Sequence, residues 1–305
     1  MQIRTGLPEK KTGSCIIALG NFDGVHLGHH RLLESALFEA RHLEAVMSIL
    51  MFDPHPLKII KPEKNIKLLT TIEQRLEIFE KLGVDQVYIL PFTRSIAKTS
   101  PRNFIIETLL PLGVIHVFVG FNYSFGAKGQ GTPEDLRLMG YEYGFKTSIL
   151  QAQSIDGHLI SSSHIRKALE LGDIYLARKM LGRAPLLSGT VIRGEQRGRL
   201  LCYPTANVLP EEDLIIPKCG VYAIWADFDN KRFYGMMNIG RKPTFHEIYH
   251  STVEVHFFNY QGDLYGKKLN VYIAARLRDE RRFSNDDELI KQLERDKVQA
   301  KRHFL

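Results

Sequence analysis

The feature that most constrains the fold is a change of hydrophobic pattern near the middle of the chain. In the first half, short apolar runs alternate with segments whose apolar residues recur at helical spacing. Alternation of this kind predicts an α/β domain built on a doubly wound parallel sheet. The expected strands are 14–19, 46–52, 85–91, 115–120 and 146–151. The expected helices are 29–44, 72–82, 101–111 and 133–143, followed by 162–170 and 173–182.

The second half contains strand patterns and turns without a helical period. The expected strands are 188–193, 220–228, 233–239, 252–258 and 269–276. This pattern predicts a small all-β barrel, because closure removes exposed strand edges. A C-terminal helix is expected from about Ser284, where Ser284 and Asp287 have the spacing of a capping box. For 305 residues we expect two domains, 1–183 and 184–305.

Composition and charge exclude some classes of protein. The formal net charge is +7, and a basic surface attracts nucleotides and phosphorylated small molecules as well as nucleic acid. The lysines and arginines form no uninterrupted block, so we expect no nucleic-acid partner. No apolar run approaches the roughly 18 residues that a membrane span needs, so we expect no membrane partner. The three cysteines have neither disulfide nor metal spacing, which favours the cytoplasm, and we expect a monomer or a weak homo-oligomer.

The first expected site lies where a buried strand meets a helix, in GNFDGVHLGHH, residues 20–30. Glycines allow a ligand close to the backbone, and free N–H groups at a helix start bind anions. His26 and His29 are three residues apart, so both face one side of the helix. Each can donate a hydrogen bond to a phosphoryl oxygen and stabilise charge during nucleotidyl transfer, without a covalent intermediate. His30 is expected at the surface.

This strand, glycine-rich turn, histidine pair and helix together resemble the nucleotidyltransferases that carry an H-x-G-H signature. In that superfamily a second element supplies Ser or Thr and a basic residue to the nucleotide. The matching segment here is ISSSHIR, residues 160–166, at the start of an expected helix. Its candidate nucleotide-binding residues are Ser161, Ser162, Ser163 and Arg166.

A second expected site begins with RGEQRGRLLCYPTANV, residues 193–208. Thr205 and Asn207 are two residues apart, so in extended backbone both point to one side and offer the oxygen ligands that suit Mg²⁺. Glu254 lies on an alternating strand, where a carboxylate can accept a hydroxyl proton during phosphoryl transfer. The residues that can fold over a phosphate tail are Gly194, Gly198 and Arg199.

The order of these motifs resembles one family, the prokaryotic bifunctional riboflavin kinase/FMN adenylyltransferases, also called FAD synthetases. The segments that carry the resemblance are GNFDGVHLGH, FDPHP, FNYSFGAKGQG, ISSSHIR, GEQRGRLLCYPTAN, NIGRKPTF, VEVHFFNYQGDLYG and RDERRF. The resemblance implies that the first domain is a nucleotidyltransferase that adenylylates FMN to FAD and releases pyrophosphate. It implies that the barrel phosphorylates riboflavin to FMN, with ATP as co-substrate and Mg²⁺ as cofactor. The implied partners are the small molecules riboflavin, FMN and ATP.

The resemblance also implies roles for individual residues. His26 and His29 would contact the ATP phosphates, and Glu254 would be the catalytic base. Thr205 and Asn207 would bind Mg²⁺. The residues implied on the nucleotide side of the first domain are Gly20, Asn21, Phe22, Asp23 and Gly24, with Ser161, Ser162, Ser163 and Arg166. The residues implied on its flavin side are Pro54, Pro56, Asn122 and Phe125.

Some positions depart from the family pattern, and two other functions stay open. Cys202 and Tyr203 stand where the family usually has glycine and phenylalanine, and Ser163 stands where threonine is common. Lys242 stands where arginine is frequent. The changes at Cys202 and Lys242 bear on the ATP affinity of the kinase. One alternative is another H-x-G-H transferase fused to a β-barrel module, which would give PTAN and VEVHFFNYQGDLYG no role. The other is a basic nucleic-acid-binding protein, which predicts exposed aromatic residues among lysines and arginines.

Overall fold

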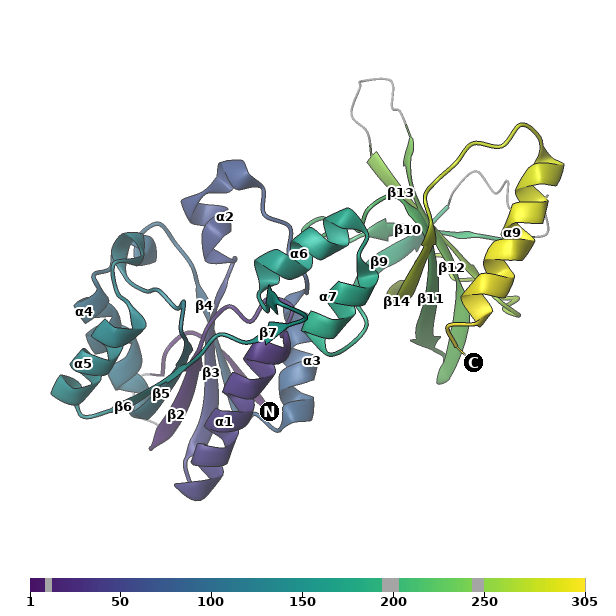
Figure 1. Cartoon of the computed structure of the whole chain (residues 1–305). Coiled ribbons are helices and arrows are strands. Elements are labelled where there is room, and N and C mark those ends of the chain that lie inside the picture. Colours follow the sequence, from purple (N-terminus) through teal and green to yellow (C-terminus); the bar gives the residue numbers. More distant parts are fainter. Residues whose placement is uncertain (9–12, 194–202, 243–249, 305) are drawn as a thin grey trace. The chain divides into compact units, whose positions relative to one another are not determined.

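The computed structural model describes residues 1–8, 13–193, 203–242 and 250–304, apart from the side chains at 241, 242, 250 and 251 (Figure 1). Its internal contacts divide the chain into two compact units. The first comprises Met1–Ile66 and Thr70–Ser161, and the second comprises Lys67–Leu69 and Ser162–Leu305. In the described part of the chain, no helix has the length and apolar composition that crossing a bilayer requires.

The first unit is built on a six-stranded parallel sheet in the order β1-β4-β3-β2-β5-β6. The strands are β1 (Gln2–Thr5), β2 (Cys15–Leu19), β3 (Val46–Asp53), β4 (Gln86–Pro91), β5 (Val114–Gly120) and β6 (Lys146–Leu150). The five expected strands are therefore confirmed, and β1 is an addition. Sequence reasoning missed β1 because all four of its residues are exposed, which leaves no alternating apolar pattern to detect. A small hairpin, β7 (Ser154–Ile155) and β8 (His158–Leu159), completes the strands of this unit.

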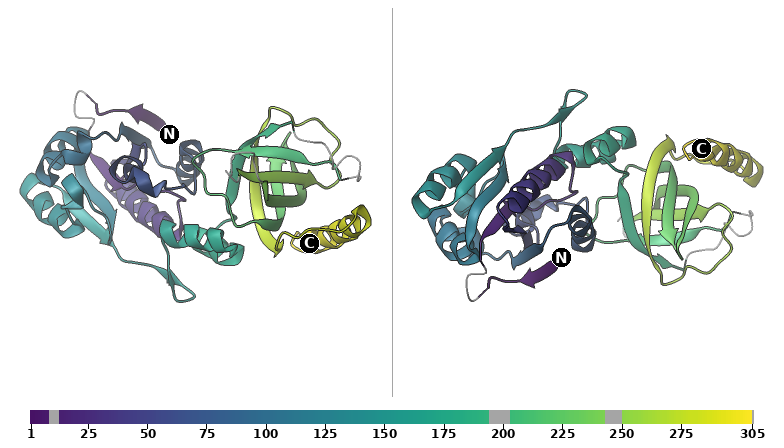
Figure 2. Two further views of the ribbon diagram at one scale, coloured as in Figure 1. Left: turned by 90° about the horizontal axis from the view of Figure 1, so that it is seen from above. Right: turned by 90° about the horizontal axis from the view of Figure 1, so that it is seen from below.

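Helices cover both faces of the sheet, as the alternation predicts (Figures 1 and 2). On one face, α1 (Leu27–His42) and α3 (Ile72–Leu82) bury their apolar sides against β2, β3 and β4. On the other face lie α4 (Pro101–Phe104), the turns η3 (Ile105–Leu109) and η4 (Leu110–Leu112), and α5 (Pro133–Tyr143). The short α2 (Pro56–Ile60) was not expected.

This winding creates an opening at one edge of the sheet. The helix that follows β2 packs on one face, and the helix that follows the neighbouring β5 packs on the other. Where the connections of two adjacent strands diverge in this way, the carboxyl ends of the strands border a crevice that holds ligands. The histidine pair follows β2, and Asn122 and Phe125 follow β5. The topology thus brings two of the predicted motifs to one edge.

The second unit begins with the helices α6 (Ser162–Leu171) and α7 (Ile174–Leu181), which are followed by a closed barrel in the order β10-β13-β12-β11-β14-β9. The barrel strands are β9 (Leu186–Ile192), β10 (Ala206–Pro210), β11 (Gly220–Phe228), β12 (Lys231–Lys242), β13 (His250–Phe257) and β14 (Lys268–Arg278). All of their pairings are antiparallel, which confirms the predicted barrel. Leu68 joins this unit, because its N–H donates to the carbonyl of Asp213 at 2.7 Å.

The C-terminal helix, α9 (Asp286–Lys301), begins after a different cap from the one predicted. Its N-cap is Asn285, whose side-chain oxygen accepts a hydrogen bond from the Glu288 N–H at 2.9 Å. The expectation of Ser284 is therefore wrong by one residue. Asn is at least as good an N-cap as Ser, and Glu288 occupies the position three residues on that Asp287 was expected to fill.

A buried ion pair fastens α9 to the barrel. Asp296 is fully buried, and the Arg278 guanidinium on β14 donates to both of its carboxylate oxygens at 2.8–3.0 Å. Gln292 donates a further hydrogen bond to the same carboxylate at 2.7 Å. A buried charge pair is costly to break, because removal of one partner leaves the other without compensation.

Replacing Asp296 with alanine should therefore lower the free energy of unfolding by about 3–5 kcal/mol, measured by urea denaturation of the full chain. The matched control is Asp227→Ala, which removes an exposed pair with Arg232 (Nε–Oδ1 2.8 Å) on the same barrel. That change should cost about 1 kcal/mol or less. Equal losses in the two variants would show that burial of the Arg278–Asp296 pair adds nothing to its strength.

Candidate functional site

The loop between β2 and α1 has a backbone that few side chains tolerate. Phe22 has φ 52°, Gly24 φ 81° and Val25 φ 36°. For bulky and β-branched residues this conformation is rare and costs on the order of 1–3 kcal/mol each. Phe22 is 1 % exposed and Val25 is fully buried, so packing holds them in place. Backbone strain that the surrounding structure maintains is typical of ligand-binding loops.

Hydrogen bonds from α3 and the turn before it hold this loop. Asp23, 3 % exposed, accepts hydrogen bonds from the N–H and hydroxyl of Thr70 at 3.1 and 3.3 Å. The same hydroxyl oxygen accepts a bond from the Gly24 N–H at 2.9 Å. The buried Arg75 guanidinium donates to the Asn21 carbonyl at 2.7 Å. Burial lowers the pKa of Arg75, and the negative charges of Asp23, Asp53 and Glu73 oppose that shift.

Thr70 and Arg75 were not among the residues predicted from the sequence. Their contacts with the loop join residues 46 to 54 positions apart in the chain. A capping box at Thr71 and Gln74 is visible in the sequence and is present in the structure. That local signal marks the start of α3 but does not indicate which distant loop the helix supports.

The two histidines lie together at the N-terminus of α1. His26 is the N-cap, and its Nδ1 accepts a hydrogen bond from the His29 N–H at 3.3 Å. The two rings stack with their centroids 3.7 Å apart and their planes 13° apart, so the pair occupies one face as the spacing predicts. Because Nδ1 of His26 accepts, its neutral ring carries the proton on Nε2, which can donate to a ligand. The helix begins at Leu27, two residues earlier than predicted.

Two further predicted segments end strands of the same sheet. Pro54 is exposed and Pro56 is the first residue of α2, after β3. Asn122 is exposed just beyond β5, whereas Phe125 is 5 % exposed and packs against Phe104, with ring centroids 5.6 Å apart. Phe125 therefore belongs to the core below this edge. All of these segments follow carboxyl ends of parallel strands, so they lie at the edge that carries the histidines.

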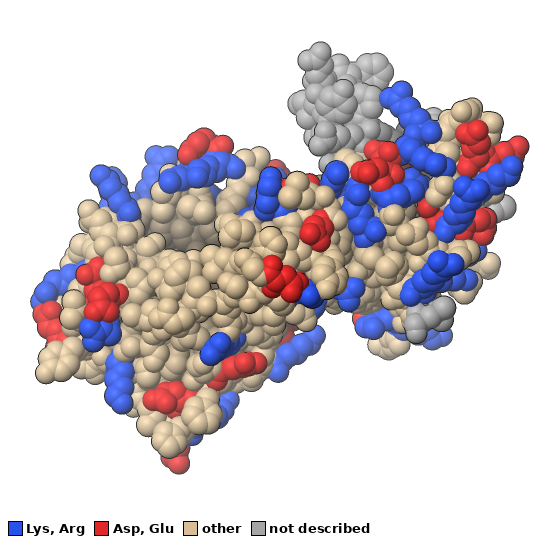
Figure 3. Space-filling view, in the orientation of Figure 1, with Lys and Arg blue, Asp and Glu red and all other residues tan. Residues whose placement is uncertain are grey.

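The surface near this edge carries positive charge. Lys58, Lys61 and Lys64 lie on or beside α2 and the turn η1 (Pro62–Lys64). Figure 3 shows a hollow over the end of the first unit that carries α2, with lysine and arginine side chains on its rim. Glu63 lies among these lysines, but the lysines outnumber it, and a recess whose border has a net charge raises the local concentration of ligands of the opposite sign. Here that favours phosphate groups.

The serine-rich segment opens α6. Ser161 precedes this helix, Ser162 is its first residue, and Ser163 is exposed in its first turn. Arg166, one turn further on, is half-buried. The contacts of the chain place Ser161 in the first unit and the helix itself in the second.

A separate polar row crosses the outside of the barrel. Asn207 on β10 lies opposite Glu254 on β13, and Glu254 lies opposite Asn238 on β12. Directly opposed residues of antiparallel strands have their side chains on the same face. All three are half-buried, and their strand neighbours Val208, Val253 and Val255 are buried. Asn238 was not predicted as a site residue, because only the register between β12 and β13 places it beside Glu254.

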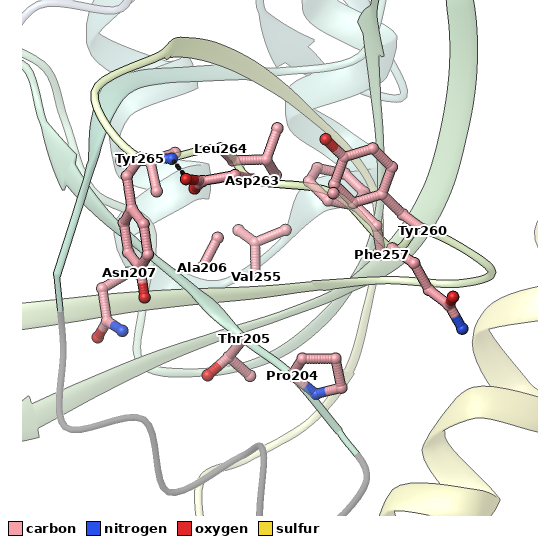
Figure 4. Close-up of a pocket in the computed structure, with 13 residues that line it drawn as sticks. Pro204, Thr205, Ala206, Asn207, Val255, Phe257, Tyr260, Asp263, Leu264 and Tyr265 are labelled. Carbon is pink, nitrogen blue, oxygen red and sulfur yellow. Dashed lines mark hydrogen bonds between the residues drawn. The ribbon is translucent and has the colours of Figure 1, made fainter.

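A pocket adjoins this row. Thr205 and Asn207 line it together with apolar side chains that include Val255, Phe257 and Leu264 (Figure 4). Hydroxyl and amide oxygens beside an apolar wall suit a ligand with a polar chain and a flat apolar body. Among the described residues, no group of three His, Cys, Asp or Glu side chains could hold a metal ion. The threonine–asparagine pair differs from such a group, because its donors are a hydroxyl oxygen and an amide oxygen.

Some predicted residues lie outside the described residues. These are Gly194, Gly198, Arg199 and Cys202. Lys242 ends β12, but its side chain is also outside the described part.

The fold and the two sites define a class of protein: an α/β domain of nucleotidyltransferase type, with a histidine pair at its ligand edge, joined to a small barrel with its own polar pocket. The FAD synthetase family matches residues 8–164, and the riboflavin kinase family matches residues 181–304. The chain belongs to the bifunctional riboflavin kinase/FMN adenylyltransferase family, which confirms the resemblance predicted from its motifs. The match of the barrel to riboflavin kinase also favours this family over both alternatives.

Two relatives and one solved structure are similar to this protein over nearly the whole length of the chain. The bifunctional riboflavin kinase/FMN adenylyltransferase of Listeria monocytogenes is 37 % identical over 95 % of this chain and 92 % of its own length. That of Bacillus subtilis is 35 % identical over 98 % and 95 %. A crystal structure titled macrolide-efflux protein from Streptococcus pneumoniae has a TM-score of 0.90 and 26 % identity, covering 99 % of each chain. That title describes the pneumococcal protein, and what the two chains share is the fold.

Proposed function

We propose that this chain makes FAD from riboflavin in two steps, each at its own site. In the barrel, the γ-phosphoryl group of ATP passes to the 5′ hydroxyl of riboflavin, giving FMN and ADP. In the α/β domain, the adenylyl group of a second ATP passes to the phosphate of FMN, giving FAD and pyrophosphate. The observation that carries the proposal is the division of the family matches: the FAD synthetase match contains the histidine pair, and the riboflavin kinase match contains Thr205, Asn207 and Glu254.

For the adenylyl step, the histidine pair would stabilise charge on the transferring phosphorus. Nε2 of His26 and the ring of His29 would donate hydrogen bonds to phosphoryl oxygens, with the helix N-terminus adding to the positive potential. The role that the structure supports for Asp23 is to keep the loop in shape through Thr70, since its carboxylate is buried. The residues assigned to nucleotide binding remain Gly20, Asn21, Phe22 and Gly24, with Ser161, Ser162, Ser163 and Arg166. Those assigned to the flavin side remain Pro54, Pro56 and Asn122, and Phe125, which is 5 % exposed, would support this side from the core below it.

For the kinase step, Glu254 would accept the proton of the riboflavin hydroxyl, which is a weak nucleophile until it is deprotonated. Mg²⁺ fits the donor set, because the hydroxyl of Thr205 and the amide oxygen of Asn207 are hard oxygen ligands that line one pocket. When bound, the ion would neutralise charge on the ATP phosphates. Gly194, Gly198 and Arg199 would cover the phosphate tail. Cys202 and Lys242 would affect the affinity for ATP rather than the chemistry.

The remaining assignments follow from the sequence. We place the functional boundary at 183/184, just ahead of β9. A cytoplasmic location is supported by Cys15 and Cys219, which are free thiols among the described residues. The partners are the small-molecule substrates alone, without nucleic acid or membrane, and the chain acts as a monomer or a weak homo-oligomer.

The direct test is to incubate the purified full chain with riboflavin, ATP and Mg²⁺ and to separate the flavins by chromatography. FMN should form first and FAD after it, and an excess of EDTA should stop both steps. A parallel reaction that starts from FMN tests the second step alone. Failure of riboflavin to become FMN would overturn the kinase assignment, and failure of FMN to become FAD would overturn the adenylyl assignment. Turnover in EDTA would contradict the role of Mg²⁺.

A further inference from the structure

The short segment that leads into β10 is anchored on α9. Tyr203 lies before the strand, yet it is only 7 % exposed. Its hydroxyl donates a hydrogen bond to the carboxylate of Glu294 on α9. Burial and the neighbouring Glu294 carboxylate raise the pKa of Tyr203, so the hydroxyl keeps the proton that it donates. The ammonium group of Lys297 on the same helix lies 5.9 Å from the centre of the Tyr203 ring.

A second contact holds the next residue of this segment. Nδ1 of His256 donates a hydrogen bond to the carbonyl of Pro204 at 2.9 Å, and the His256 ring lies 5.1 Å from the Tyr203 ring. Burial lowers the pKa of His256, the bond to Pro204 opposes that shift, and the charge of Lys297 adds to it. A neutral ring with its proton on Nδ1 is sufficient for this bond. His256 lies two residues after Glu254 on β13, on the same face of the strand.

These contacts hold a part of the chain that has no backbone pairing with neighbouring strands. The register of β10 begins at Ala206, which pairs with Val255. Asn207 is held by pairing to Glu254 on one side and to Ile192 on the other. Thr205 precedes the first paired residue, and Pro204 has no N–H with which to extend the ladder. Figure 4 shows Pro204 and Thr205 leading into the strand along the pocket.

We propose that Tyr203, Glu294 and His256 are positioning residues that hold Thr205 beside Asn207 for the kinase step. This proposal rests on the assignment of Thr205 and Asn207 to Mg²⁺. Under this proposal α9 supports the metal site. Glu294 on this helix holds Tyr203, and Asp296, two residues further along, fastens the helix to the barrel.

The test compares Tyr203→Phe and Glu294→Ala in the full chain, measuring the Mg²⁺ concentration at half-maximal riboflavin phosphorylation. Loss of one charge-assisted hydrogen bond should raise that concentration by roughly tenfold, with kcat at saturating Mg²⁺ within about twofold. The double variant should be no worse than the single ones, because both remove the same bond. Binding of Mn²⁺ in the presence of ADP, followed by electron paramagnetic resonance, should weaken to the same extent without any turnover.

His256 allows an independent test with two variants, one that removes its hydrogen bond to Pro204 and one that keeps a donor for it. His256→Ala should weaken metal binding, whereas His256→Gln keeps an N–H donor for Pro204 and should restore much of it. The matched control is Tyr234→Phe, because Tyr234, on β12, is another tyrosine of the barrel that contacts the C-terminal segment, at Phe304, with ring centroids 4.5 Å apart. Conversion of FMN to FAD should be unchanged in every variant, because its proposed residues of the histidine loop lie in the first unit, and the melting temperature of each variant reports on the fold of the barrel.

The outcomes separate this proposal from the proposed function. An unmodified chain that does not phosphorylate riboflavin would overturn the kinase assignment itself. If the unmodified chain is active and the Tyr203, Glu294 and His256 variants keep its Mg²⁺ and Mn²⁺ affinities, the positioning role is wrong. A lower melting temperature with unaltered metal affinity would likewise show that these contacts only stabilise the fold.

Discussion

Replacing His29 with alanine should lower the rate of FMN adenylylation by at least about a hundredfold, because removal of one donor that stabilises transition-state charge typically costs that much. His29 stacks on His26 at the helix N-terminus, with ring centroids 3.7 Å apart. Riboflavin phosphorylation should continue at its original rate, because the proposed kinase residues lie in the other compact unit. The measurement is the separate rate of each step, starting from FMN or from riboflavin.

The matched control for this prediction is His42→Ala. It removes the same kind of side chain from the exposed last residue of α1, at the opposite end of the helix from His26 and His29. Adenylylation should then stay close to that of the unmodified chain. If His29→Ala abolished both steps together, the existence of two separate sites would be contradicted. If it slowed neither, the histidine pair would have no part in the transfer.

Replacing Glu254 with glutamine should lower riboflavin phosphorylation by about 10²–10⁴-fold, the usual contribution of a general base. Glutamine keeps the shape and hydrogen-bonding capacity of the side chain opposite Asn207, but it cannot accept a proton. Conversion of FMN to FAD should be unaffected. The rate of FMN formation from riboflavin at saturating ATP and Mg²⁺ measures the effect.

Glu211→Gln is the appropriate comparison on the same barrel. Glu211 forms a surface ion pair with Lys268 at 2.9 Å, and its loss should leave both activities near their original values. A kinase rate for Glu254→Gln equal to that of this control would remove Glu254 from the mechanism. A loss of adenylylation in the same variant would instead indicate damage to the fold.

Several elements of the fold could be predicted because their signals are local. The buried strands of the first sheet are apolar runs, and the helices between them carry apolar residues at helical spacing. Ser100 and Pro101 start α4, and Gly83 and Gly113 end their helical segments in left-handed conformations, and each of these residues is a typical helix start or stop signal in the sequence. The errors lie where two local signals compete or where none exists. Asn285 caps α9 in place of the adjacent Ser284, and β1 forms by backbone pairing alone.

The candidate sites divide in the same way. The spacing of His26 and His29 predicts their shared face, and the interval between Thr205 and Asn207 predicts a common direction. Thr70 and Arg75, which hold the histidine loop, could not be identified, because no feature of α3 in the sequence indicates contact with residues 21–24. Likewise, the positions of Asn238 beside Glu254 and of Glu294 beside Tyr203 depend on strand register and helix docking.

The amino-acid sequence by itself determined the kinds of element, their order and the family, because periodicity, caps and short motifs act over a few neighbouring residues. Tertiary structure decided which residues support the two sites. The strained turn at Phe22–Val25 is held by its packing and by its hydrogen bonds to Thr70 and Arg75. The polar row of the barrel depends on the register that sets β13 between β10 and β12. The physical reason is that these contacts join residues distant in the chain, and their geometry is set only when the sheet and the barrel have closed around them.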